Sequence, residues 1–225
     1  VGAFYFTPPI AEFNKKILAV KTETFAEWLK RMVPKETTVM TWDVIYNSGG
    51  FFNQNDFWLD GRLVGSYRKR NLFPFADYTP KWAQNMSFYT TPFDIVRGEE
   101  NQLFSLSGGL SFGNLICSEI SSQALALADA RKSQIIISAG SEAMFADSVA
   151  SAFNLMHARY RAAENNIPVI RANRFGPSAI IAPDGSLVSK MNRGEDGVMT
   201  GEIEIKERQM TLFNTFGNVI IIFLI

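Results

Sequence analysis

The sequence predicts a mixed α/β layer fold formed by one domain. Segments rich in β-branched and aromatic residues, which are typical of strands, recur along the 225-residue chain. Segments with a helical spacing of apolar residues are interposed between them. No repeat, low-complexity tract or linker divides the chain, and a single core can be large at this length. We therefore expect residues 1–225 to form one domain.

The first half is expected to contain a strand, a helix and then a strand-rich stretch. VGAFYF (residues 1–6) is typical of a buried strand, and KKILAVKTETFAEWLKRMV (15–33) places several apolar residues on one helical face, namely Leu18, Phe25, Trp28, Leu29 and Met32. TTVMTWDVIYNSGGFF (37–52) is strand-like with SGG as a turn, and DGRLVGSYRK (60–69) is typical of a turn and a strand. NLFPFADYTPKW (71–82) is expected to be irregular because its two prolines remove backbone donors.

The second half alternates strands with two clearer helices. Strands are expected at NQLFSL (101–106), LSFGNLIC (110–117) and QIIISAG (134–140), with a helix at SSQALALADARKS (121–133) between the last two. DSVASAFNLMHARYRAAENN (147–166) is the clearest helix, and we take one face of it as the core face: Val149, Ala152, Phe153, Met156, Tyr160 and Ala163. IPVIRAN (167–173), SAIIAPDGSLVSK (178–190) and GVMTGEIEI (197–205) are expected to finish the fold as strands joined by turns.

Composition excludes several classes of function. Lys plus Arg and Asp plus Glu both number 22, so there is no net charge that would attract nucleic acid, and we expect no nucleic-acid partner. With one cysteine and one histidine, the chain has neither a disulfide framework nor a Cys/His zinc cluster. The sequence implies no metal, nucleotide or other cofactor.

The two ends of the chain differ in character. The start lacks the basic leader of a cleavable signal peptide. The run FGNVIIIFLI (216–225) is apolar to its last residue but shorter than the roughly 20 residues that span a bilayer. Two interpretations stay open: a last buried strand, or the start of a transmembrane helix.

The single cysteine, Cys117, is either a nucleophile or a small buried residue. A thiol attacks as its thiolate, so a nucleophilic cysteine needs a group that takes its proton. The one histidine, His157, lies within a predicted helix and is expected to have a packing role. A carboxylate base and an ammonium partner are left, and strand alternation turns Lys69 away from the face of Arg68 and Arg70, which are expected to be solvated.

Three segments resemble motifs of one enzyme family. YRKRNLFPFADYTP (67–80) resembles a segment of the bacterial apolipoprotein N-acyltransferases, the membrane-embedded branch of the nitrilase (carbon-nitrogen hydrolase) superfamily. FGNLICSEI (112–120) is similar to their nucleophile segment, and HARYRAAENNIPVIRANRFGPSAIIAPDGSLV (157–188) to a later block. The similarity runs from about Tyr46 to the C-terminus as three ordered motifs.

This resemblance implies a nitrilase-like αββα sandwich and a set of site residues. Cys117 would be the nucleophile, at a tight turn between a strand and a helix where backbone N–H groups can help to hold an oxyanion. Lys69 would be the catalytic lysine. Glu119 and Asp77 match acidic positions that support the site, and Asp77 stands where the family usually has Glu.

The chain also departs from the family pattern. The family's general base is a Glu, usually in W-P-E, whereas here Asp43 follows Trp42 without the proline. Either Asp43 is the base, or this strand matches the family's next one and the chain is truncated near its N-terminus. The loop SEAMFADS (141–148) replaces the usual N-D-x-W-F-G-x-S, which makes Glu142 a candidate substrate or support residue. Ser118 replaces a Tyr after the nucleophile and is a smaller, more polar wall.

The resemblance implies acyl transfer through a thioester on Cys117. The donor would be a phospholipid and the acceptor the N-terminal amine of a lipoprotein, at the bacterial inner membrane with this domain facing the periplasm. One alternative is a soluble, cytoplasmic amidase or nitrilase in which water resolves the thioester. Another is a catalytically inactive nitrilase-like module. The oligomeric state does not follow from the sequence.

Overall fold

The structure is a computed structural model that describes residues 6–7, 24–85, 91, 93–99, 103–106, 108–145, 148–205, 207 and 209–217. The chain forms two compact units. The first comprises Val1–Glu100 and Leu106–Gly109, and the second comprises Asn101–Ser105 and Leu110–Ile225. The expectation of a single domain stays a prediction.

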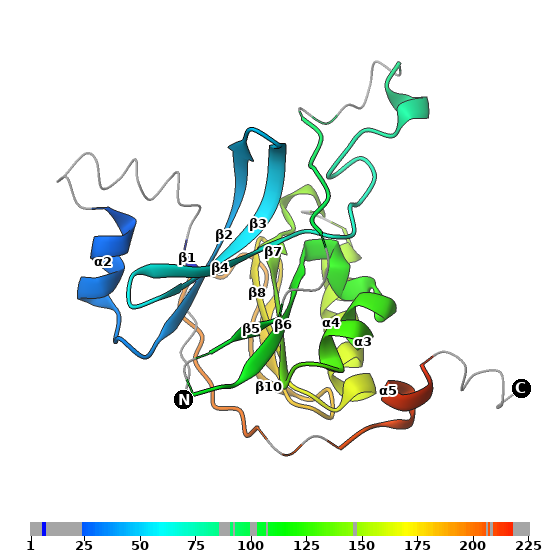
Figure 1. Ribbon diagram of the computed structural model, residues 1–225. Helices are drawn as coiled ribbons and strands as arrows, with labels where there is room; N and C mark the ends of the chain where they lie inside the picture. Colours follow the sequence, from blue (N-terminus) through cyan, green and yellow to red (C-terminus); the bar gives the residue numbers. More distant parts are fainter. Residues whose placement is uncertain are drawn as a thin grey trace, which may run out of the picture. The chain divides into compact units, whose positions relative to one another are not determined.

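The first unit contains a four-stranded sheet in the order β1-β2-β3-β4 (Figure 1). Its strands are β1 (Phe6–Thr7), β2 (Thr38–Asn47), β3 (Gly50–Leu59) and β4 (Arg62–Arg68). β1 pairs with β2 in parallel, and β2, β3 and β4 form an antiparallel meander. The predicted SGG turn joins β2 to β3, and the predicted turn at residues 60–61 joins β3 to β4. Residues 1–5 of the predicted first strand lie outside the described residues.

Helix α2 (Phe25–Met32) begins at a capping box. The Thr24 hydroxyl accepts the N–H of Glu27 at 3.3 Å, and the Glu27 carboxylate accepts the N–H of Thr24 at 2.8 Å, which satisfies two donors at the helix start. Phe25 and Leu29 pack with Val39 of β2 in a small core. Met32, expected on that face, is 55% exposed, and Leu18 lies outside the described residues.

The chain after β4 is irregular, as the prolines predicted. A 3₁₀ helix, η1 (Lys81–Ala83), is the only helix in the described part of residues 69–99. The N–H of Ile95 donates to the carbonyl of Asp77 at 2.7 Å, and the N–H of Val96 donates to that of Phe51 at 2.7 Å. The first bond joins two parts of the irregular stretch, and the second joins the stretch to β3 of the sheet.

The second unit contains a six-stranded sheet in the order β10-β9-β8-β7-β6-β5. Its strands are β5 (Phe104–Ser105), β6 (Ser111–Ile116), β7 (Ile135–Ser141), β8 (Val169–Arg174), β9 (Ser178–Ile181) and β10 (Leu187–Met191). The three central strands β6, β7 and β8 run parallel. Since the carboxyl ends of parallel strands meet at one edge, the residues that follow β6 and β7 are expected to be neighbours.

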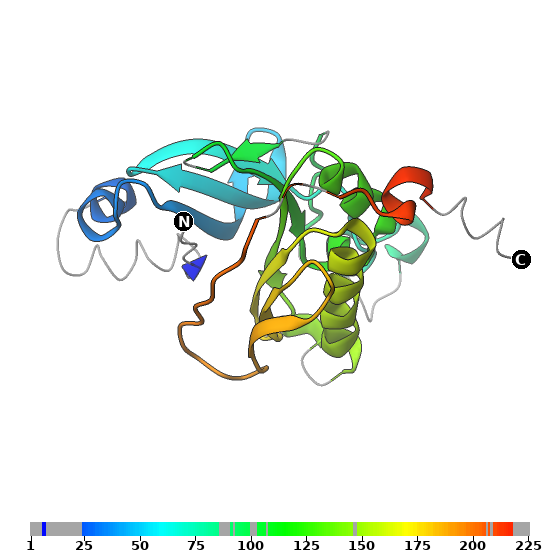
Figure 2. The ribbon, with the colours of Figure 1, turned by 90° about the horizontal axis from the view of Figure 1, so that it is seen from below.

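Helices α3 (Gln123–Ala130) and α4 (Ala150–Asn165) lie on the same face of this sheet (Figures 1 and 2). Short 3₁₀ helices follow β6 and β7, namely η2 (Cys117–Ser121) and η3 (Ala143–Phe145). The core between the helices and the sheet combines alanines of the helices, such as Ala126, Ala158 and Ala162, with aliphatic residues of the strands. The small helical residues let the helices approach the sheet closely.

The core face of α4 is not the face that the apolar residues predicted. Its buried residues are Ser151, Asn154, Ala158, Arg161, Ala162 and Asn165. Val149 is 70% exposed, and Phe153 and Tyr160 are each 51% exposed. Close packing against the sheet favours the alanine face. Two of the buried polar residues on this face are hydrogen-bonded: Asn154 donates to Glu142, and Asn165 donates to the carbonyl of Arg161.

The C-terminal part differs from the prediction in one element. GVMTGEIEI (197–205) forms no strand. A short helix, α5 (Leu212–Phe216), is fixed to the ends of the two longer helices, since Arg131 donates to the Asn214 carbonyl at 2.8 and 3.0 Å. Of the apolar run at 216–225, residues 218–225 lie outside the described residues. Within the described part of the chain, no helix combines the length and apolar character needed to cross a bilayer.

Candidate active site

Cys117 lies where β6 ends and η2 begins. Its backbone φ is 53°, in the left-handed region that residues other than glycine seldom adopt. Strain of this kind persists only where the surrounding structure enforces it, and it is concentrated at functional sites. The side chain is partly exposed, whereas the strand before it is buried. The expected strand-to-helix turn is therefore present at the candidate nucleophile.

Glu119 stabilises this turn from within. Its side chain is fully buried, and Oε2 accepts the N–H of Ile116 at 2.8 Å. This bond satisfies a backbone donor at the start of η2 and holds the residue before Cys117. Ser118 lies between these residues in η2, and its carbonyl accepts the Ser121 hydroxyl at 2.7 Å.

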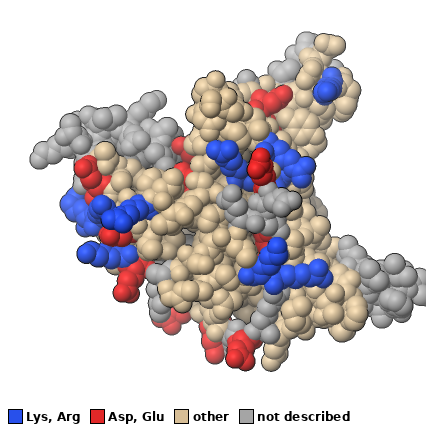
Figure 3. All heavy atoms as spheres, in the orientation of Figure 1, with Lys and Arg blue, Asp and Glu red and all other residues tan. Residues whose placement is uncertain are grey.

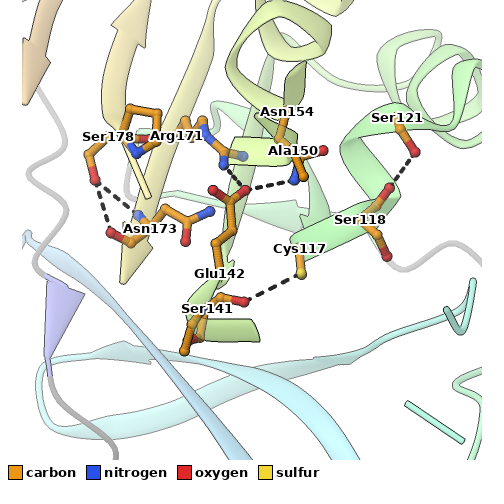
Figure 4. Close-up of polar contacts among 12 residues, drawn as sticks. Cys117, Ser118, Ser121, Ser141, Glu142, Ala150, Asn154, Arg171, Asn173 and Ser178 are labelled. Carbon is orange, nitrogen blue, oxygen red and sulfur yellow. Dashed lines mark hydrogen bonds and ion pairs between the residues drawn. The ribbon is translucent and has the colours of Figure 1, made fainter. Parts of the chain in front are cut away.

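The Cys117 thiol faces the end of β7. It donates to the carbonyl oxygen of Ser141 across 3.5 Å (Figure 4). Gly140 lies beside it, and a Cβ added at Gly140 would be 2.9 Å from the Cys117 Cβ and 3.0 Å from its backbone nitrogen. Only glycine allows β7 to approach the nucleophile this closely.

Glu142 follows β7 and is fully buried. Its Oε1 forms an ion pair with the guanidinium of Arg171 in β8 and accepts the side-chain amide of Asn154 at 2.8 Å. Figure 4 shows the carboxylate between these two donors. Glu142 therefore belongs to a buried network next to the thiol.

Lys69 follows β4 in the first unit and is 1% exposed. Its ammonium lies 2.5 Å from Oδ2 of Asp77, which also accepts the N–H of Phe73 at 2.7 Å. The first unit thus brings together the candidate lysine and its acidic neighbour, eight residues apart in sequence.

The arginines on either side of Lys69 are less solvated than expected. Arg70 is 4% exposed and donates from Nε to the hydroxyl of Tyr67 at 2.8 Å. The guanidinium of Arg68 lies 3.8 Å from the ring centre of Phe52. Aromatic faces attract arginine, so both side chains pack on the first unit.

The register of the first sheet separates Asp43 from Lys69. Asp43 in β2 pairs with Gln54 in β3, and Gln54 pairs with Arg68 in β4, so these three side chains share one face of the sheet. Arg68 confirms this by donating to the Gln54 side chain at 2.9 Å. The N–H of Lys69 donates to Asn53 at 2.9 Å, which continues the alternation and turns the lysine to the opposite face. The structure therefore does not bring Asp43 and Lys69 together.

His157 lies on α4, next in sequence to Ala158 of the core. Burial lowers the pKa of its imidazole from the usual 6.5, and the positive charge of Arg161 lowers it further, while Glu164 acts in the opposite direction. The imidazole is therefore neutral at pH 7.

Charged side chains on the face shown in Figure 3 stand in small groups of both signs among larger uncharged areas. In α2, for example, Glu27 lies in the first turn, and Lys30 and Arg31 lie in the last turn. This local mixing matches the zero net charge of the chain.

Comparison with known proteins identifies the family of this chain. The family model described as "Carbon-nitrogen hydrolase" matches residues 14–211. The chain belongs to the carbon-nitrogen hydrolase family. In sequence, this carbon-nitrogen hydrolase is 29% identical over 149 residues to the apolipoprotein N-acyltransferase of Pseudomonas paraeruginosa, a match that covers 64% of this chain and 29% of that relative. It is 32% identical over 143 residues to the apolipoprotein N-acyltransferase of Aquifex aeolicus, covering 62% of this chain and 32% of the relative. The chain thus spans less than a third of these curated relatives.

Solved structures agree on the fold. An amidase from Nesterenkonia sp. superposes with a TM-score of 0.58 at 18% identity, covering 84% of this chain and 73% of the amidase. A variant of a Nesterenkonia amidase from the nitrilase superfamily gives a TM-score of 0.56 at 17% identity. At such identity these likenesses show the fold alone. The predicted nitrilase-like αββα class is confirmed for this carbon-nitrogen hydrolase.

Two residues of the network beside the nucleophile were not assigned from the sequence. Arg171 lies in the predicted strand IPVIRAN (167–173), and the structure shows that it forms a buried salt bridge with Glu142. Asn154 carried no signal because it lies on the helix face that the apolar pattern assigned to solvent. The one local signal in the sequence is the position of Arg171 within an apolar strand, because an arginine buried there needs a charged or polar partner.

Proposed function

We propose that this carbon-nitrogen hydrolase is an acyltransferase that moves a fatty acyl chain from a phospholipid to the N-terminal amine of a lipoprotein. The observation that carries the proposal is the match to apolipoprotein N-acyltransferases over 149 residues. The resemblance of the segments around Lys69 and Cys117, seen from the sequence, supports it. The proposed place of work is the bacterial inner membrane, with this domain on the periplasmic side.

In the first half-reaction a carboxylate takes the proton of the Cys117 thiol. The thiolate attacks the ester carbonyl of the phospholipid, and the tetrahedral oxyanion collapses with cleavage of the C–O bond. The proton passes to the leaving alkoxide, so a lysophospholipid departs and a thioester stays on Cys117. Lys69, which is paired with Asp77, is the proposed partner of the oxyanion.

In the second half-reaction the acceptor amine attacks the thioester carbonyl. The C–S bond breaks, an amide forms, and the amine's surplus proton returns through the base to the thiol. Glu119 supports both steps by holding the turn that presents Cys117. Ser118 and Glu142 are the proposed neighbours of the substrate and of the nucleophile. Asp43 is the candidate base from the sequence, and its place on the sheet face opposite Lys69 weighs against it.

Hydrolysis of a small amide is the second candidate function. It is favoured by the likeness of the fold to an amidase from Nesterenkonia sp.. The same thioester would form on Cys117 with loss of ammonia or an amine, and water would resolve it. The two candidates therefore differ in acyl donor and acceptor rather than in nucleophile.

The test is to incubate the folded chain, in detergent, with a phospholipid that carries an isotopically labelled acyl chain. Intact mass spectrometry should show one acyl adduct, and Cys117→Ala should show none. Addition of a peptide whose N-terminal cysteine carries a diacylglyceryl group on its sulfur should remove the adduct and transfer the label to the peptide amine. Asp43→Asn then tests the base: an unchanged rate of adduct formation would exclude Asp43.

Other outcomes point elsewhere. If no lipid adduct forms while small amides are hydrolysed, the chain is an amidase and the lipid proposal is wrong. If neither reaction occurs and Cys117 resists alkylation in the folded protein, the chain is an inactive module.

A further inference from the structure

The peptide group between Ser141 and Glu142 is held on both sides. The N–H of Glu142 donates to the carbonyl oxygen of Arg174 in β8 at 2.9 Å. In a trans peptide the C=O points opposite to the N–H, so the Ser141 carbonyl is directed away from β8. Because β7 lies between β8 and β6, this direction leads to the end of β6. There the carbonyl accepts the Cys117 thiol at 3.5 Å.

The side chain of Glu142 is held by two donors from different elements. Arg171 of β8 donates from Nη2 to Oε1, and Asn154 of α4 donates to the same oxygen at 2.8 Å. Arg171 is itself fixed, because its Nε donates to the carbonyl of Pro177 at 3.1 Å. A strand and a helix therefore hold one carboxylate, and that carboxylate belongs to the residue after the thiol's acceptor (Figure 4).

The buried network of Glu142, Arg171 and Asn154 fills the core at a higher desolvation cost than apolar residues of similar size would. Glu142 and Arg171 are both fully buried, and burial of a charge pair is often no more stable than apolar residues of similar size. Among the described residues, Glu142 Oε2 and Arg171 Nη1 also have no hydrogen-bond partner. A buried polar atom without a partner is costly, so packing alone does not account for the network.

We infer that Arg171 is a positioning residue that acts through Glu142 to fix the Ser141 carbonyl as the acceptor of the Cys117 thiol proton. A carbonyl oxygen accepts from a thiol but offers nothing to a thiolate. The contact therefore holds Sγ in one orientation and favours the protonated, resting form until a base removes the proton. The inference rests on the proposed role of Cys117 as the nucleophile. It does not depend on the identity of the acyl donor.

The pH profile of Cys117 alkylation tests this role. The rate constant for iodoacetamide is measured from pH 6 to 10 on the folded full chain, with folding checked by circular dichroism. We expect Glu142→Ala and the double variant Glu142→Ala/Arg171→Met to lower the midpoint of the profile by about half a pH unit, since the protonated thiol loses its fixed acceptor and a thiol is a weak donor. The double variant leaves no unpaired buried charge, so it is expected to stay folded even if the single variant does not.

Glu164→Ala is the matched control. Glu164 also accepts from a buried arginine of the second unit, with Arg161 Nη2 at 3.0 Å, but the structure gives it no contact with Ser141 or Cys117 in the described residues. It should lower stability and leave the midpoint unchanged. A folded double variant with the parent midpoint would overturn the inference, as would an equal shift in Glu164→Ala. The assay uses no acyl donor, so a chain that fails to transfer acyl groups still gives a decisive profile.

Discussion

The buried ion pair of the first unit predicts a large stability effect at Asp77. The Lys69 and Asp77 side chains are 1% and 6% exposed, and their charged atoms lie 2.5 Å apart. Removal of one partner of such a pair leaves an uncompensated buried charge, which costs about 3–5 kcal/mol. Asp77→Asn keeps the shape of the side chain and an oxygen for the N–H of Phe73, so it isolates the loss of charge. We expect it to lower the free energy of unfolding by about 3–5 kcal/mol.

Urea unfolding followed by circular dichroism at pH 7 measures this loss. The double variant Lys69→Met/Asp77→Asn carries no buried charge at the site and should recover most of the stability, to within about 1 kcal/mol of the parent. Lys35→Met, which removes an exposed lysine of the same unit, should change stability by less than about 0.5 kcal/mol. The reasoning is refuted if Asp77→Asn costs less than about 1 kcal/mol, or if the double variant is as unstable as the single one.

Three further predictions concern the second unit. Gly140→Ala should lower the free energy of unfolding by roughly 1–3 kcal/mol, because the new Cβ would lie 2.9 Å from the Cys117 Cβ. His157→Gln should reduce the loss of stability between pH 7.5 and 5.5. The pKa of His157 is lowered in the folded state, chiefly by burial, so the unfolded chain binds a proton before the folded chain does as the pH falls below about 6.5. The parent protein is therefore destabilised in this pH range, whereas the variant lacks the group that causes the effect. Asn214→Ala should cost about 1–3 kcal/mol and speed proteolysis near residues 209–217, because it removes a 2.8 Å hydrogen bond to the buried Asn165 side chain.

Each of these predictions has a result that contradicts it. Gly197→Ala is the control for the glycine, since its Cβ would meet only the end of Met191 at 3.4 Å, and an equal effect of both alanines would remove the argument from close approach. A His157→Gln variant with the same pH dependence as the parent would show that this imidazole does not contribute to acid sensitivity. Unchanged proteolysis of Asn214→Ala would mean that the bonds from Arg131 and Thr211 are sufficient to hold α5.

Local patterns were sufficient for much of the fold and for part of the site. Strand alternation has a period of two and is a property of adjacent residues, so the burial of Lys69 could be predicted from its neighbours, although the same alternation wrongly predicted a solvated Arg70. The strand, turn and helix around Cys117 were likewise predictable from a buried apolar run followed by serines that can cap a helix. The only thiol in the chain could be named from composition, and the family from three ordered motifs.

Contacts between distant segments decided the rest. Helical periodicity shows which residues of α4 share a face, but the close approach of the sheet selected the alanine face over Phe153 and Tyr160. The register across β2, β3 and β4 put Asp43 on the face opposite Lys69, although the two are close in sequence. The partner of Glu142 is Arg171, which lies 29 residues further along the chain. The sequence by itself determined which residues can carry the chemistry and the family to which they belong. Only the tertiary structure decided which of them meet, because register and packing depend on partners that no local pattern contains.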